Sequence, residues 1–86
     1  MKAIKFTDLE FEPVEGRGIQ ALIEFDNGYE VSVVKHQFSY GGKKGMYEIG
    51  VFYNNHMVDP ADWGSTVKGW LNPEDVEKEV ALIQAL

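Results

Sequence analysis

The sequence predicts an α+β fold, in which a small antiparallel β-meander of roughly four to five strands packs against one C-terminal α-helix. Three observations predict it. Apolar and polar residues alternate over residues 19–25 and 29–33, on either side of the turn sequence Asp26-Asn27-Gly28. The same alternation returns over residues 46–53. Finally, Asn72-Pro73-Glu74-Asp75 is typical of a helix start, and apolar residues recur at helical spacing after it.

Length and composition limit the chain to one small globular unit. The 86 residues suffice for one hydrophobic core, so we expect a single α+β domain over residues 1–86. The chain has no cysteine, which excludes disulfides and thiolate nucleophiles and fits a reducing cytoplasm, where we expect the protein to act. It has no apolar run long enough for a signal peptide or a membrane span, so we expect no membrane partner.

The formal net charge of −6 disfavours direct binding of nucleic acid or anionic lipid. Two interpretations of this charge stay open. It either keeps the protein soluble, or it forms an acidic face that meets a basic partner surface.

The loop of the first clear hairpin can be derived from the face pattern. A two-residue loop would pair Phe25 with Glu30 and mix the apolar and polar faces. A three-residue loop with Gly28 in the left-handed region pairs Phe25 with Tyr29 and keeps the faces separate. This register also sets Glu24 opposite Glu30 on the outer face, an unfavourable like-charge pair that suggests an external use for the acidity.

Two segments beside this hairpin have weaker signals. Residues Lys2 to Phe6 alternate charged and apolar side chains and predict a first strand, followed by an acidic stretch over residues 8–15 that we expect to be a loop or a sheet edge. Residues 37–45 are rich in glycine and lysine and predict a mobile loop.

The second hairpin is predicted over residues 46–58. Asn54-Asn55 tolerates positive φ, so a tight turn there pairs Phe52 with Met57. Asp59-Pro60 then ends the short strand. Residues 62–70 predict an irregular crossover that lays at least one of its two tryptophans on the core.

The C-terminal helix is predicted from residue 73, with Asn72 as its N-cap and Pro73 at its first position. Its expected apolar face covers the sheet and consists of Val76, Val80, Ile83 and Leu86.

Two glycine-rich segments resemble phosphate-binding motifs but lack their context. Gly16-Arg17-Gly18-Ile19-Gln20-Ala21 matches the loose dinucleotide pattern, yet a strand pattern follows where that motif needs a helix. Gly41-Gly42-Lys43-Lys44-Gly45 lacks the spacing and the Ser or Thr of a P-loop. We therefore expect no cofactor, although Tyr40 and the two lysines of this loop could contact a small anion, a base or a partner.

No catalytic or metal constellation is visible in the sequence. His36 and His56 each stand without a second ligand at metal spacing. Ser39 lacks a nucleophile elbow, and the carboxylates of Glu24 and Glu30 are expected to be exposed, which does not favour a general-acid role. The sequence therefore predicts a protein that is not an enzyme.

Three segments resemble short proteins encoded by tailed bacteriophages and prophages: residues 25–34, residues 45–51 and residues 67–76. The resemblance covers roughly residues 18–86 and implies a phage origin and a shared fold. It implies no activity, because most such proteins have no assigned function. The segment Met57-Val58-Asp59-Pro60-Ala61-Asp62-Trp63 departs from the pattern.

These observations favour a non-enzymatic phage accessory protein that binds a host protein with a basic surface, such as a defence or nucleic-acid-processing factor. The alternatives are a small-ligand-binding protein that uses residues 40–45, with homo-oligomer formation as one arrangement, and a minor virion or assembly component. The residues expected to contact a partner are Glu24, Asp26, Glu30, Tyr40, Lys43, Lys44 and Trp63.

Overall fold

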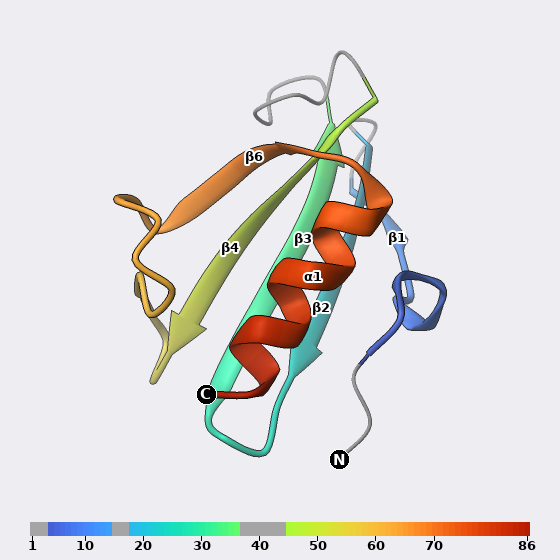
Figure 1. Cartoon of the computed structure of the whole chain (residues 1–86). Coiled ribbons are helices and arrows are strands. Elements are labelled where there is room, and N and C mark those ends of the chain that lie inside the picture. The colour runs from blue at the N-terminus through green and yellow to red at the C-terminus, as the bar shows by residue number, and fades with distance from the viewer. Residues whose placement is uncertain (1–3, 15–17, 37–44) are drawn as a thin grey trace.

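The computed structural model describes residues 4–14, 18–36 and 45–86, and it confirms the α+β fold with one C-terminal helix (Figure 1). A single antiparallel sheet carries α1 on one face. The elements are the short 3-10 helix η1 (Phe6–Asp8), β1 (Glu12–Val14), β2 (Gly18–Glu24), β3 (Tyr29–His36), β4 (Tyr47–Tyr53), β5 (His56–Met57), β6 (Val67–Leu71) and α1 (Pro73–Gln84).

The sheet has the strand order β1-β2-β3-β4-β5, and β6 also pairs with β4. All pairs are antiparallel, so the chain forms a meander with β1 at one edge. Odd-numbered side chains of β2, β3 and β4 point toward α1. They form the core with the apolar face of the helix, and its buried residues are Ala21, Phe25, Val31, Val33, Tyr47, Ile49, Val51, Leu71, Val76, Val80 and Ile83.

Both predicted turns are confirmed. Phe25 and Tyr29 flank a three-residue loop, in which the Phe25 N–H donates to the Tyr29 carbonyl at 2.9 Å and Gly28 has φ +93°. Asn54 and Asn55 have φ of 51° and 65°, which sets Phe52 opposite Met57 as expected. The register also confirms Glu24 opposite Glu30.

The helix start is confirmed as well. The Asp75 N–H donates to Asn72 Oδ1 at 2.8 Å, and Pro73 occupies the first helical position. The helix ends at Gln84, earlier than the apolar pattern suggests. Leu86 lies beyond the helix and is half exposed, so it is not part of the core face.

The C-terminal end of α1 is held by the turn between β2 and β3. Asn27 Nδ2 lies 2.9, 3.2 and 3.1 Å from the carbonyl oxygens of Ile83, Gln84 and Leu86. Carbonyls at the end of a helix have no partner within it, so a donor from a distant turn satisfies them. The bonds to Asn27 fix the β2–β3 hairpin to the helix.

The predicted first strand is wrong for the part that the structure describes. Residues 4 and 5 are not in a strand, and Phe6 begins η1. The N–H groups of Ile4 and Phe6 donate to the side chains of Gln84 and Glu77 on α1, at 3.1 and 2.9 Å. Because helix side chains accept these bonds, the segment packs beside α1 instead of joining the sheet.

The crossover over residues 62–70 is only partly irregular. Residues 67–71 form β6, which the sequence analysis missed. The pairing shifts between Tyr47 and Ile49, where residues 69 and 70 together oppose Glu48. This bulge interrupts the alternation of side chains that would otherwise indicate a strand.

Candidate functional site

The sheet has one face packed on α1 and one face that no described element covers (Figure 1). We call the uncovered side the outer face. The register assigns to it the even-numbered positions of β2, β3 and β4 and their neighbours on β1, β5 and β6. Its members include Glu12, Val14, Gly18, Gln20, Leu22, Glu24, Glu30, Ser32, Val34, Glu48, Gly50, Phe52, Met57, Val67 and, at the bulge, Trp70.

Acidic side chains gather on the outer face near the β2–β3 turn. Glu24 and Glu30 lie directly opposite each other, and Asp26 is exposed in the adjoining turn. Within residues 4–14, 18–36 and 45–86, neither Glu24 nor Glu30 forms a salt bridge. The three acidic residues predicted to contact a partner are therefore brought together at one end of the sheet.

The described lysines all lie on the other side of the sheet. Lys5 and Lys68 pair with Glu77 and Glu79 of α1, at 3.9 and 3.4 Å. Lys35 Nζ lies 5.1 Å from the ring centroid of Tyr47, a core residue, and Lys78 belongs to α1 itself. Among the described lysines, none is therefore placed to neutralise Glu24 or Glu30 on the outer face.

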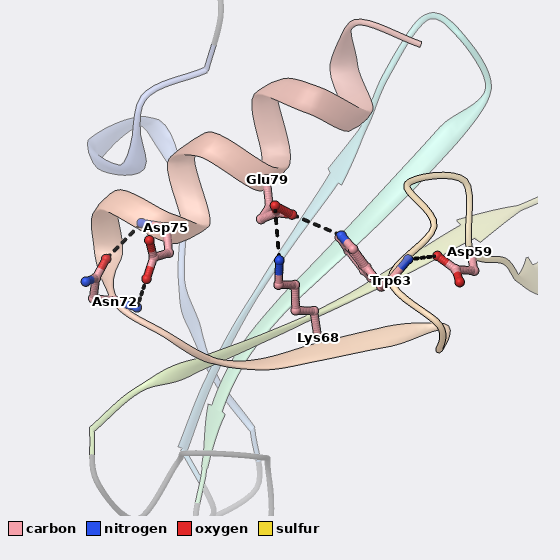
Figure 2. Close-up of polar contacts among 6 residues, drawn as sticks. All are labelled: Asp59, Trp63, Lys68, Asn72, Asp75 and Glu79. Atoms are coloured by element: carbon pink, nitrogen blue, oxygen red, sulfur yellow. Dashed lines mark hydrogen bonds and ion pairs between the residues drawn. The ribbon is translucent and has the colours of Figure 1, made fainter.

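Trp63 has an internal role in the structure. Figure 2 shows its indole pointing toward α1, where Nε1–H donates to Glu79 Oε2 at 3.0 Å. Its backbone N–H donates to Asp59 Oδ1 at 2.8 Å, and Asp59 also accepts from the Gly64 N–H at 2.9 Å. Glu79 is shared with Lys68, so this network fastens the crossover and β6 to the helix (Figure 2).

The other tryptophan is the exposed one. Trp70 is 55% exposed and has φ +60°, whereas the other non-glycine residues at positive φ in the described part of the chain are Asn or Asp. Asn and Asp adopt the left-handed region readily, but an aromatic residue there costs on the order of 1–3 kcal/mol. Of the two tryptophans, Trp63 and not Trp70 was among the residues predicted from the sequence to contact a partner.

Apolar side chains surround Gly50 on the outer face. A Cβ placed on Gly50 would lie 3.3 Å from Met57 Cε, 3.7 Å from Val67 Cγ1 and 4.0 Å from Phe52 Cε1. Met57 is 45% exposed, and Leu22, which lies in the same cross-strand row as Gly50, is 61% exposed. This apolar patch was missed, although the correctly predicted pairing of Phe52 with Met57 already implied that the two lie on one face.

A hollow of about 240 Å³ lies at the β1–β2 edge of the outer face. Its lining mixes two carboxylates and one amide, from Glu10, Glu12 and Gln20, with the apolar side chains of Pro13, Val14 and Leu22. Lys and Arg side chains combine an aliphatic stem with a charged head. The hollow has the chemistry to accept such a side chain.

The remaining predicted contacts, Tyr40, Lys43 and Lys44, lie outside the described residues. His56 is exposed on β5, and the described part of the chain contains no group of His, Cys, Asp and Glu residues that could hold a metal ion. Within that part, α1 is too short and too polar to cross a membrane.

The comparisons with known proteins found no relative of this chain. No family model matches it, and neither a curated protein nor a solved structure matches it significantly. A function is therefore inferred from the chemistry of the outer face.

Proposed function

We propose that this chain is a non-enzymatic, phage-type accessory protein whose outer face binds a basic surface of a host protein. The observation that carries the proposal is the cluster of carboxylates at one end of the uncovered side of the sheet. Glu24, Asp26 and Glu30 gather on the uncovered side, while the described lysines are used on the helix side.

The arrangement is unfavourable for the isolated domain. Glutamates directly opposite each other on neighbouring strands destabilise a sheet by a few tenths of a kcal/mol. A solubilising surface does not require such a pair, because single carboxylates on separate rows would serve equally well. Glu24 and Glu30 would instead have a function if this face attracts Lys and Arg residues of a partner.

Electrostatic attraction of this kind acts mainly on the association rate. Opposite charges on two surfaces accelerate encounter and make it sensitive to salt. The resemblance to phage proteins favours a partner in the bacterial cytoplasm, and a basic surface is common among proteins that process nucleic acid.

The test starts from host proteins captured on the immobilised full chain, followed by kinetics with the isolated partner. The double variant Glu24→Lys/Glu30→Lys should associate roughly tenfold more slowly at about 0.01 M salt, where charges interact over about 30 Å. At about 0.15 M salt, where that length is about 8 Å, the difference between the parent and the variant should shrink.

Glu74→Lys is the matched control for either single reversal, Glu24→Lys or Glu30→Lys. Glu74 is exposed on α1, on the opposite side of the sheet, and its reversal changes net charge by as much as either single reversal on the outer face. It should leave the association rate near that of the parent. Equal rates and equal salt dependence for the parent and the double variant would refute the proposal.

A further inference from the structure

The outer face has an apolar centre beside its acidic end. Gly50 leaves a gap in the row of side chains on β4, and the Met57 methyl group reaches over it to within 3.3 Å of the Cβ position. Phe52 and Val67 border the same gap. The flexible thioether of Met57 adapts its shape to whatever packs against it.

Trp70 lies at the β6 edge of this centre. It opposes Glu48 through the bulge, and Leu71 beside it returns to the core side by pairing with Tyr47. More than half of its surface is exposed, in a backbone conformation that disfavours a bulky residue. A strained backbone that leaves an aromatic side chain in solvent does not stabilise the isolated domain. The conformation of Trp70 therefore points to a contact with another molecule.

The strand register places acidic residues in the rows next to the apolar centre. Glu24 and Glu30 share a row with Phe52 and Met57. On the opposite side of the Gly50 row, Glu12 and Glu48 lie at the two ends of a row that they form with Gln20 and Val34. An apolar centre with a polar rim is the usual composition of a protein interface, and tryptophan is enriched among the residues that contribute most to its affinity.

We propose that Trp70 and Met57 form the apolar centre of the docking surface, and that the partner presents apolar side chains flanked by Lys or Arg. This inference rests on the proposed function and specifies the chemistry of its partner. Charge complementarity selects this occupant over a second copy of the chain, because a symmetric contact through the outer face would bring the carboxylates of Glu24 and Glu30 against those of another acidic molecule.

The probes are two synthetic helical peptides with the same number of lysines. One carries leucine along one helical face, and the other carries glutamine at those positions. Their affinities for the full-length chain are measured by fluorescence anisotropy of a label on the peptide. The parent protein should bind the Leu/Lys peptide at least about tenfold more tightly than the Gln/Lys peptide.

Two variants test the centre separately. Trp70→Gly removes the indole and places at this position the residue best suited to positive φ, so the bulge is preserved. Met57→Gln keeps the length of the side chain and removes its apolar character. Each should reduce the affinity for the Leu/Lys peptide about fivefold to tenfold and leave the affinity for the Gln/Lys peptide unchanged.

Leu82→Gln is the matched control for Met57→Gln. Leu82 is 44% exposed, close to the value for Met57, but it lies on α1. It should not change either affinity. Thermal denaturation of each variant verifies that the fold is intact.

The outcomes separate the inference from the proposed function. If the parent binds both peptides equally, or if both centre variants keep full affinity, the apolar centre is refuted while charge-driven binding stands. If the double variant Glu24→Lys/Glu30→Lys still binds the two peptides as tightly as the parent does, the proposed function is refuted instead. If the parent binds neither peptide, both are refuted, and a dimer that Trp70→Gly dissociates would identify a second copy as the occupant.

Discussion

Replacing Gly28 tests the hairpin on which the outer-face register depends. Gly28 has φ +93°, so an alanine there costs about 1–2 kcal/mol in backbone strain. Its Cβ would also lie 2.9 Å from Tyr53 Cε1, so the ring must move and weaken its contact with Tyr29, whose ring centroid lies 4.9 Å away. Loss of an aromatic pair costs about 0.5–1.5 kcal/mol. Gly28→Ala should therefore lower the free energy of unfolding by about 2–3 kcal/mol, and Gly28→Val by more, because a branched Cβ resists positive φ.

The assay is urea unfolding of the full chain, with thermal unfolding as a second measurement. For a domain of this size the midpoint temperature should fall by roughly 10–20 °C. Gly64→Ala is the matched control: Gly64 has φ +80° but nothing within 4 Å of the added Cβ, so this change reports the backbone strain alone, about 1–2 kcal/mol. Equal losses for the two variants would refute the contribution of Tyr53, and an unchanged midpoint for Gly28→Ala would refute the left-handed turn.

Three other substitutions test the contacts that fix α1. Asn72→Ala should cost about 1 kcal/mol in urea unfolding because the Asp75 N–H loses its acceptor, and Asn72→Ser should restore most of it. Asn27→Ala should cost about 1–2 kcal/mol, and Asn27→Asp should cost more at neutral pH because a carboxylate would face the carbonyls at the helix end; equal losses would contradict this role. Trp63→Phe removes the bond to Glu79 and should cost about 1–2 kcal/mol, whereas an unchanged unfolding midpoint would show that the bond does not stabilise the crossover.

Local signals were sufficient for the two hairpins and the helix start. The apolar residues of β2 and β3 all have odd numbers, so the register of the two strands follows once the length of the loop between them is known. Gly28, at positive φ, determines that length. The cap of α1 depends on residues within a single turn. In both cases the residues that decide the structure are neighbours in the sequence.

The errors arose where distant contacts decide the structure. Residues 4–6 alternate like a strand, but the N–H groups of Ile4 and Phe6 donate to side chains more than 70 residues away. The two tryptophans look equivalent in the sequence. Which one is exposed depends on the β6 bulge and on Glu79, which accepts the indole N–H of Trp63. The acidic half of the candidate site was accessible to sequence reasoning, and its apolar half required the complete sheet.

Exposed apolar residues are common on small proteins and carry little information singly. Leu82 and Leu86 are exposed near the C-terminal end of α1, with no strained backbone at either position. The outer face is different because three separate departures from local optimality coincide there: Glu24 opposite Glu30, Trp70 in the left-handed region, and Met57 exposed over a gap at Gly50. A natural sequence tends to break local rules where function requires it. Solubility would explain the acids alone, and chance would explain one exposed apolar residue, but a docking surface explains why all three departures lie on one uncovered side of the sheet.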